Sequence, residues 1–257
     1  VIIQECVVCF VWCSAVVQGH LFTGYSATGK TGKITKTNGR RHILEIDDRP
    51  ASVVYNEWAG GEWSKYMAEA EDSNILGPSS LYPLGQTCGE DKEGEPIFRS
   101  MHPHLLVKST NSVTLFSDVK VGERICMMSG TKENIVNRIA GVATHIMNNA
   151  EFSLREVQGC LVVFCAGCMM YCDESMDIAC QKLSKALGGA PYIGMHTFGE
   201  QGQFPDGHNR HGNLMFSSLV FSSKRRHARL LNVDSGEEIN EGDPRFEEVF
   251  LTATICE

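Results

Sequence analysis

The feature that most constrains the fold is an alternation of apolar runs with glycine-rich or polar turns between residues 159 and 221. The run from Cys160 to Phe164 is short enough for a buried strand, and Tyr192–Thr197 and Leu214–Phe221 are runs of the same kind. Between the first two runs, apolar residues recur at helical spacing until a Gly-Gly pair ends the helix. The apolar positions of this predicted helix are Met176, Ala179, Cys180, Leu183 and Leu187. The order strand, helix, strand, polar loop, strand predicts that the polar residues gather in the turns.

Upstream, the chain alternates between strand-like and helical stretches. Residues 34–37 and 42–46 are separated by an Asn-Gly pair, which is typical of a hairpin. A helix is predicted to begin after Asp47-Asp48, with these residues as its acidic cap and a proline in the first turn. Residues 73–94 are predicted to form a long packed loop between the two halves of the chain.

Three antiparallel strands are predicted at residues 97–101, 112–116 and 123–128. Residues 132–148 are amphipathic and are expected to form a helix on this sheet, capped by a residue between Ser129 and Thr131. Its apolar face consists of Ile135, Ile139, Val142, Ala143 and Ile146. We therefore predict an α+β fold with mixed or antiparallel sheets flanked by helices. The fold is expected to have two related halves, of which the first is incomplete.

One stretch matches a phosphate-binding pattern without its usual context. Gly24 to Thr31 fits G-x-x-x-x-G-K-T residue for residue. That loop binds phosphate because a helix begins at the Lys-Thr pair and directs its amides at the anion. Here the continuation through Gly39 is β-branched and alternating, which indicates a strand. We therefore predict that Gly24–Thr31 does not bind a nucleotide.

Composition limits the classes of binding partner and the cellular compartment that we expect for the protein. The formal net charge of −8 disfavours binding to nucleic acid. No run of about twenty uncharged apolar residues is present, so no membrane span is predicted, and residues 1–17 are expected to form buried strands. Eleven cysteines, mostly in apolar runs, indicate free thiols in a reducing compartment. We expect an intracellular location, in the cytoplasm or an organelle stroma.

Several local motifs resemble the FIST domain family. In the second half these are the FCAGC corner, the GEQG turn and the HGNLMF return, and in the first half GKITKTNGRRHILEIDDRPASVVYNEW and LYPLG. The resemblance assigns residues 1–95 to the end of the FIST N-terminal half with a crossover loop. Residues 96–257 correspond to the C-terminal half with an acidic extension. The family implies a sensory module that binds a small polar, amino-acid-like molecule, without established enzyme chemistry or a cofactor.

The candidate ligand site combines two corners that follow strands. Gly199, Glu200 and Gln201 offer a carboxylate and an amide next to a glycine, where a ligand can approach the backbone closely. Cys165 and Cys168 lead into a helix whose first amides can hold an anionic group. Further polar lining is expected from Asn209 and Asn213, with Tyr171 or Phe198 as a wall. The alternative is that the glycines serve tight turns and that Glu200 has a structural role.

Other chemistries use some of the same residues. Cys165 and Cys168 with His208 and His211 have the residue types of a zinc site, although no metal is our preferred assignment. Cys168 is also a candidate redox thiol resolved by Cys172, or a nucleophile with a histidine as base. The pair His102 and His104 is predicted to lie in an edge or turn with exposed imidazoles.

The preferred function is a non-enzymatic FIST-type module that binds a small polar metabolite and passes a signal to a partner protein. A structural accessory subunit of a larger assembly is the first alternative. A thiol- or zinc-dependent enzyme built around Cys165 and Cys168 is the second, so whether the chain is an enzyme stays open.

Overall fold

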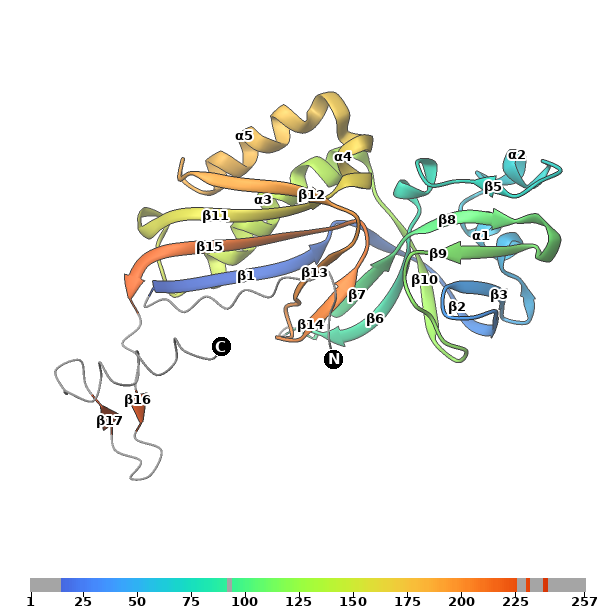
Figure 1. Cartoon of the computed structure of the whole chain (residues 1–257), viewed down its shortest axis with the longest axis horizontal. Coiled ribbons are helices and arrows are strands. Elements are labelled where there is room, and N and C mark those ends of the chain that lie inside the picture. The colour runs from blue at the N-terminus through green and yellow to red at the C-terminus, as the bar shows by residue number, and fades with distance from the viewer. Residues whose placement is uncertain (1–14, 92–93, 226–229, 232–237, 240–257) are drawn as a thin grey trace, which may run out of the picture. The chain divides into compact units, whose positions relative to one another are not determined.

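The computed structural model describes residues 15–91, 94–225, 230–231 and 238–239 (Figure 1). It divides into two compact units, one from Val17 to Ser222 and one that comprises Val1–Val16 and Ser223–Glu257. In the second unit, β16 (Leu230–Leu231) and β17 (Glu238–Ile239) pair antiparallel. Residues 1–14 of the expected N-terminal strands, and most of the acidic extension, lie outside the described residues.

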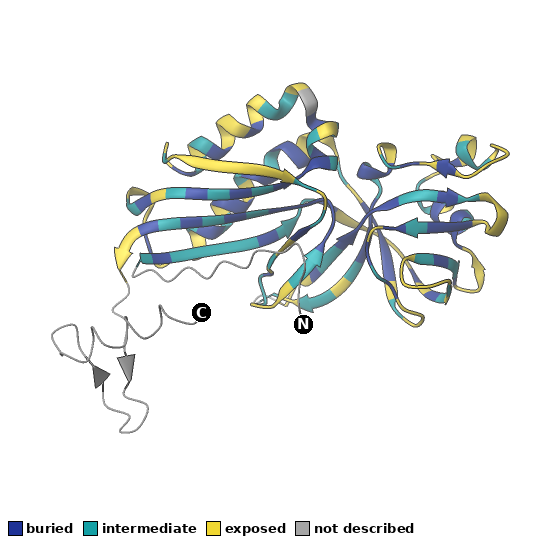
Figure 2. Ribbon diagram, in the orientation of Figure 1, coloured by how far each residue is buried: buried dark blue, intermediate teal, exposed yellow. Residues whose placement is uncertain are grey.

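The smaller sheet of the first unit has four strands in the order β1, β15, β11 and β12. Their bounds are Ala15–Thr23 for β1, Met215–Arg225 for β15, Val157–Cys165 for β11 and Tyr192–Thr197 for β12. β11 pairs parallel with β12 and antiparallel with β15, so the sheet is mixed. Figure 2 shows that β12 is exposed along most of its length, whereas β11 alternates between buried and half-buried residues.

The helix predicted after Cys165 is interrupted. It consists of α4 (Ala166–Cys172) and α5 (Met176–Ala186), which are joined by the 3-10 turn η4 (Asp173–Ser175). Ala179, Leu183 and Leu187 are buried as predicted. Cys180 is exposed, so its assignment to the apolar face was wrong. It follows Ala179 by one residue and is therefore turned about 100° around the helix from that buried position.

Helix α3 (Lys132–Asn149) follows the sequence pattern closely. The Thr131 side chain accepts a hydrogen bond from the Asn134 N–H at 3.1 Å, which confirms a cap within the predicted residues. All the residues predicted for its apolar face are buried. The helix packs beside α5 and α4, and the ring of its His145 contacts Phe22 of β1 with centroids 4.6 Å apart. It therefore lies against the smaller sheet rather than on the three predicted strands at residues 97–128, which corrects its expected position (Figure 1). Within the described residues, no helix is both long and apolar enough to cross a membrane.

The larger sheet has nine antiparallel strands, eight of them in the order β5-β8-β9-β3-β2-β10-β6-β7, with β4 paired to β3. Its first strands along the chain are β2 (Ser26–Thr37), β3 (His42–Ile46), β4 (Arg49–Pro50) and β5 (Ser73–Asn74). The later strands are β6 (Leu84–Glu90), β7 (Pro96–Met101), β8 (Pro103–Val107), β9 (Ser112–Leu115) and β10 (Arg124–Ser129). The short helices are α1 (Ala51–Trp58), α2 (Ser64–Met67), η1 (Pro78–Leu81), η2 (Lys108–Thr110) and η3 (Leu154–Glu156). Together with the smaller sheet, this arrangement confirms the predicted α+β class.

Two local predictions for the first half were wrong. Residues 73–94 are not one loop, because they contain β5, η1 and β6. Asp47 and Asp48 do not cap α1, whose cap position is occupied by Pro50 without a side-chain hydrogen bond. Both aspartates have positive φ angles, of 50° and 59°. They form the tight turn between β3 and β4, a role in which aspartate tolerates the left-handed conformation.

The phosphate-binding pattern lies largely within a strand, as predicted. Lys30 and Thr31 are inside β2, and Thr31 pairs with Cys126 of β10. The Lys30 ammonium donates a hydrogen bond to the Trp58 carbonyl oxygen at 2.7 Å. No helix begins at the Lys-Thr pair, so the amide cradle for a phosphate is missing at this position.

An apolar core fixes α1 against the larger sheet. Tyr55 of α1 and Trp63 are fully buried, and their rings stack with centroids 5.3 Å apart. The Tyr55 hydroxyl donates to the Tyr82 carbonyl oxygen at 2.7 Å, so its polar end is satisfied. Burial of two aromatic side chains of this size contributes several kcal/mol and anchors α1 on the larger sheet.

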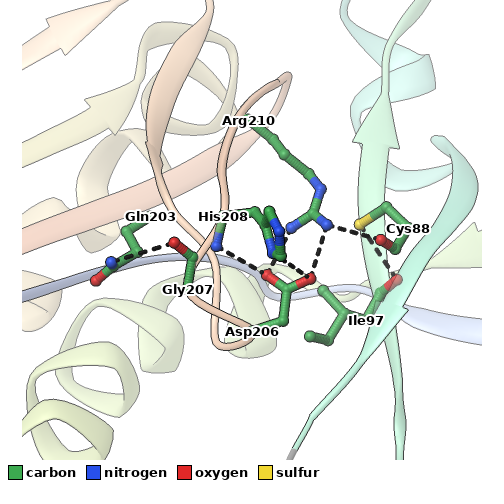
Figure 3. A network of polar contacts seen from close by, with 7 residues as sticks. All are labelled: Cys88, Ile97, Gln203, Asp206, Gly207, His208 and Arg210. Atoms are coloured by element: carbon green, nitrogen blue, oxygen red, sulfur yellow. Dashed lines mark hydrogen bonds and ion pairs between the residues drawn. The ribbon is translucent and has the colours of Figure 1, made fainter.

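The Gly199–Gly202 turn was also predicted incorrectly. Glu200–Gln203 is the strand β13, which pairs antiparallel with β14 (Asn209–Gly212). Figure 3 shows how the tip of this hairpin is held: the Arg210 guanidinium donates to Asp206 at 2.6 and 2.7 Å and to the Cys88 carbonyl oxygen on β6 at 2.8 Å. The hairpin therefore docks on the larger sheet and carries Glu200 and Gln201 of the Gly-Glu corner with it.

Candidate functional site

A cavity of about 310 Å³ lies where the ends of the two sheets meet. The smaller sheet and its connections contribute Cys165, Gly167, Met170, Phe198 and Gly199. The segment around β14 contributes His211 and Asn213, and segments next to the larger sheet contribute Arg41, Leu76, His102 and Phe116. Cys165 of the predicted Cys corner and Gly199 of the predicted Gly-Glu corner therefore line the same cavity.

The predicted site residues separate into two groups. Cys165, Gly199 and Asn213 are among the residues that line the cavity. Cys168 and Glu200 are buried behind it, with exposed fractions of 0% and 1%. Gln201 pairs with His211, and Asn209 pairs with Gln203, so both lie on the hairpin with exposed side chains and outside the lining. Of the two proposed wall residues, Phe198 lines the cavity.

The cavity mouth is apolar. Phe198 and Met170 are 88% and 56% exposed, and Phe116 lies beside them in the lining. The His104 ring stacks on Phe116 with centroids 4.3 Å apart. Large apolar side chains that stay exposed around a concave site are a common feature of ligand-binding clefts.

One cationic side chain reaches the cavity. The Arg41 Nε donates to Asp118 at 3.0 Å, and Arg40 forms a second ion pair with the same carboxylate. The pKa of Asp118 is lowered mainly by the hydrogen bond from Arg41, and the charge of Arg40 lowers it further. Two guanidinium groups share one carboxylate, so this side of the cavity carries excess positive charge, which favours an anionic ligand group.

Two imidazoles in the lining are held neutral. Burial lowers the pKa of His102 to about 4, and burial is also the main cause of the lowered pKa of His211. His102 is 4% exposed, so the expectation of an exposed imidazole was wrong for this residue. Its Nε2 donates to the Leu76 carbonyl oxygen at 3.0 Å, because a carbonyl can only accept. Neutral imidazoles offer hydrogen bonds to a polar ligand without adding charge.

Asn213 ties the smaller sheet to the larger one. Its side-chain Oδ1 accepts hydrogen bonds from the His102 N–H at 3.2 Å and the Ser117 hydroxyl at 2.5 Å. Its backbone N–H donates to the Ser100 carbonyl oxygen at 2.9 Å, and its carbonyl oxygen accepts from the Ser100 hydroxyl at 2.7 Å. These bonds occupy Oδ1 and fix the position of the cavity wall.

Glu200 stabilises the loop behind the cavity. Its carboxyl group accepts hydrogen bonds from the Met215 N–H at 3.1 Å and the Thr197 hydroxyl at 3.0 Å. The pKa of Glu200 is raised to about 8, mainly by burial and to a smaller extent by the neighbouring Cys165. The carboxyl group is therefore mostly protonated at pH 7. The adjacent Gly199 has a φ of +100°, and a Cβ atom there would lie 3.0 Å from the His211 Nε2. A glycine is required at this position for both reasons.

The two cysteines of the corner interact directly. The Cys165 thiol donates a hydrogen bond to the Cys168 sulfur, which raises the pKa of Cys165 and lowers that of Cys168. The charge of the buried Arg138 and a hydrogen bond with the Tyr25 hydroxyl, 3.5 Å from Cys168 Sγ, lower the Cys168 pKa further. The pair therefore shares one proton more readily than an isolated pair of buried thiols would.

The proposed zinc ligands do not form a metal centre in the described part of the chain. His208 lies at the hairpin tip, where its Nδ1 is 3.5 Å from Asp206 and its side chain is 73% exposed (Figure 3). His211 lines the cavity instead. Among the described residues, no group of three or more His, Cys, Asp or Glu is arranged to hold a metal ion.

Sequence reasoning missed the contribution of the larger sheet to the site. Arg41, Leu76, His102 and Phe116 are far from the Cys corner in the sequence, and only the packing of the two sheets brings them to the cavity. The signal available in the sequence was the His102-Pro103-His104 segment, which places two imidazoles close together. Its burial depends on Leu76 and Ser79, whose approach no local pattern indicates.

Comparison with known proteins identifies the family. The FIST C domain model matches residues 51–203. No curated protein and no solved structure gives a significant match. The predicted division between two FIST halves at residue 95 stays a prediction. Because the match covers more than half of the 257 residues, the chain belongs to the FIST C domain family.

Proposed function

We propose that the cavity binds a small polar metabolite that carries a carboxylate and has about the size of an amino acid. The observation that carries the proposal is the meeting of the Cys corner and the Gly-Glu corner at one hollow of about 310 Å³. This volume lies at the small end of the range of about 300–1,000 Å³ that is usual for ligand pockets. It favours a single small molecule over a nucleotide or a peptide.

The cavity lining offers partners both for the carboxylate and for the remaining part of such a ligand. Arg41 offers its terminal nitrogens to a carboxylate, since its hydrogen bond to Asp118 uses Nε. The neutral His102 and His211 add polar atoms, and Phe198 and Met170 provide an apolar rim. Of the residues proposed from sequence, we assign ligand contact to Cys165, Gly199 and Asn213. We assign Cys168 and Glu200 to the layer that supports them, and Gln201 and Asn209 to the hairpin surface.

Thermal denaturation tests this proposal. A panel of amino acids and small organic acids is compared with matched amides that lack the carboxylate. A ligand at about one hundred times its Kd stabilises the native state by about 2.7 kcal/mol, which raises Tm measurably. Arg41→Gln should reduce the shift for acids. Arg40→Gln is the matched control, because Arg40 contacts the same Asp118 without lining the cavity. Equal shifts for acids and amides would contradict the role given to Arg41.

The bound state is proposed to be read by a partner protein inside the cell. Ligand binding changes such an interaction only if one arrangement of the partner surface binds the ligand better than another. The cysteines in the described part of the chain are free thiols, in agreement with a reducing compartment. This function needs no enzymatic step and no cofactor.

An accessory subunit of a larger assembly is the second candidate, and strand β12 favours it. β12 is at the edge of the smaller sheet, and Ile193 and Met195 on it are 71% and 51% exposed. Exposed edge strands without charges or prolines pair readily with another chain. Light scattering of the purified protein distinguishes the candidates, because a stable monomer at micromolar concentration argues against an obligate subunit.

A further inference from the structure

The side chains that line the cavity offer few hydrogen-bond acceptors. Among the described residues of the lining, none is an aspartate or a glutamate, and Asn213 has the one side-chain oxygen. That Oδ1 already accepts two hydrogen bonds, from the His102 N–H at 3.2 Å and the Ser117 hydroxyl at 2.5 Å. An amide oxygen has two lone pairs, so both are used, and the amide nitrogen can only donate. The side-chain oxygens of the lining therefore have no acceptor left for an ammonium group.

Several backbone oxygens of the lining residues are also engaged. The Leu76 carbonyl oxygen accepts from His102 Nε2 at 3.0 Å, and the His102 carbonyl oxygen accepts from the Phe116 N–H at 3.1 Å. The Asn213 carbonyl oxygen accepts from the Ser100 hydroxyl at 2.7 Å. An ammonium group brings three N–H donors, and leaving such donors buried without partners is costly.

The charges around the cavity also disfavour a cation. Burial lowers the pKa of His211, and the charges of Arg99 and Arg41 lower it further. Asp118 acts in the opposite direction, but its carboxylate is already paired with Arg41. Burial is likewise the main reason why the pKa of His102 is lowered to about 4. Surroundings that disfavour the protonated form of an imidazole disfavour an ammonium group for the same physical reasons.

The apolar part of the lining indicates what the rest of the ligand is. Phe198 and Met170 are exposed at the mouth of the cavity, and Phe116 lines it as well. An apolar group on the ligand would cover these side chains and remove apolar surface from water. Because Arg41 is the one cationic side chain among the described lining residues, it matches one carboxylate, and a second carboxylate would have no cation.

We propose that the ligand is a monocarboxylic acid that has an apolar or aromatic body and no amino group, so that the cavity discriminates against the corresponding amino acid. This inference rests on the proposed function, because it names the class of carboxylate that the same site binds. The carboxylate pairs with Arg41, and the apolar body lies against Phe116, Met170 and Phe198. The carbon next to the carboxylate then faces a lining that has few acceptors for a charged nitrogen.

Isothermal titration calorimetry of the purified wild-type chain tests the inference with probes that share one apolar body. Hydrocinnamate has the carboxylate alone, phenylalanine adds an ammonium group, and phenyllactate has a neutral hydroxyl at the same carbon. We expect hydrocinnamate to bind at least about tenfold more tightly than phenylalanine, because the ammonium would lose its hydration without gaining enough acceptors. Phenyllactate should bind with nearly the affinity of hydrocinnamate, since its added group is uncharged. Isocaproate and leucine form a second pair with a smaller body and should show the same order.

Variants at Met170 separate the effect of charge from that of shape. Met170 lines the cavity from α4 and is more than half exposed, so a polar side chain is compatible with the fold at this position. Met170→Glu should reduce the preference for hydrocinnamate over phenylalanine several-fold, because the new carboxylate supplies an acceptor and a counter-charge for the ammonium. Met170→Gln is the matched control, since it has the same shape without the charge and should reduce the preference less.

The possible failures distinguish this inference from the proposed function. If phenylalanine binds at least as tightly as hydrocinnamate and Arg41→Gln weakens both, the carboxylate site stands and the inference is wrong. If phenyllactate binds as weakly as phenylalanine, the cavity excludes bulk rather than charge, and the inference is again wrong. If neither hydrocinnamate nor isocaproate nor their amino acids bind, both the inference and the proposed function are overturned.

Discussion

The Asp206 carboxylate binds both terminal nitrogens of Arg210, at 2.6 and 2.7 Å, across one turn of the β13–β14 hairpin (Figure 3). Arg210 also donates to the Cys88 carbonyl oxygen at 2.8 Å, so the pair connects the hairpin to β6. A Cβ atom at Gly89 would lie 2.6 Å from Asp206, which shows how closely the two elements approach. The Asp206–Arg210 pair and its bond to Cys88 therefore hold β14, the strand that carries His211, in place beside the cavity.

Arg210→Lys should therefore destabilise the protein by about 1–2 kcal/mol, because lysine cannot form the bidentate pair and reach Cys88 at once. Urea denaturation measures the change. Arg49→Lys is the control, because its pair with Glu57 is half exposed and surface ion pairs of this kind contribute little to stability. Equal losses in the two variants would show that the Arg210 pair is only a surface contact.

Gly24→Ala and Gly141→Ala should have opposite effects on stability. A Cβ at Gly24 falls on the buried Arg138, so overpacking is expected to cost about 1–3 kcal/mol or more. A Cβ at Gly141 in α3 meets nothing within 4 Å, and alanine in a helix interior is favoured by about 0.5–1 kcal/mol. Thermal and urea denaturation report both. A stabilising Gly24→Ala would contradict the placement of Arg138.

Glu200→Gln should change how stability depends on pH. The pKa of Glu200 is raised from 4.5 to about 8 in the folded chain, so its neutral form is the one the fold favours. Its contribution is complete below pH 4.5 and is lost as the pH rises through 8, with a slope of at most about 1.4 kcal/mol per pH unit. Glutamine stays neutral, so the variant should gain stability relative to wild type between pH 5 and 8. Parallel pH profiles of the two proteins would exclude a raised pKa for Glu200.

His102→Gln should show the opposite trend in acid. The folded chain lowers the pKa of His102 from 6.5 to about 4, so the neutral imidazole stabilises the fold above pH 6.5. That contribution is lost as the pH falls from 6.5 through 4. At pH 8 the variant should be less stable by about 1–3 kcal/mol, because hydrogen bonds to Leu76 and Ser79 change. The difference should narrow as the pH falls to 5. A constant difference would mean that His102 titrates normally.

Local patterns predicted several elements because the determining residues are close in sequence. The Asn38-Gly39 hairpin and the Thr131 cap of α3 were found on this basis, and the apolar face of α3 is buried as predicted. The strand β6 was missed because Gly85 and Gly89 resemble loop residues. In the structure, side chains at these two positions would collide with Met128 and Asp206. Their glycines thus reflect long-range packing, which no local window contains.

The residues of the candidate site were likewise predictable only where residues close in sequence determine their position. Cys165, Gly199 and Asn213 come from corners that the alternation of apolar and polar runs locates. Arg41 and His102 come from the other sheet, and their approach follows from the docking of the two sheets rather than from any motif. Glu200 has the buried, hydrogen-bonded environment of a structural carboxyl group, which was the alternative that its glycine-flanked sequence left open.

The walls of the cavity belong to both sheets, so neither sheet alone encloses a guest molecule. A guest that contacts Arg41 and Gly199 together would add a bridge between segments that are otherwise joined by Asn213 and the hairpin tip. Backbone amides on both sides should then exchange with deuterium more slowly at the same time, even for strands remote from the guest. Ligand binding would therefore be detected as slower amide exchange in both sheets at once.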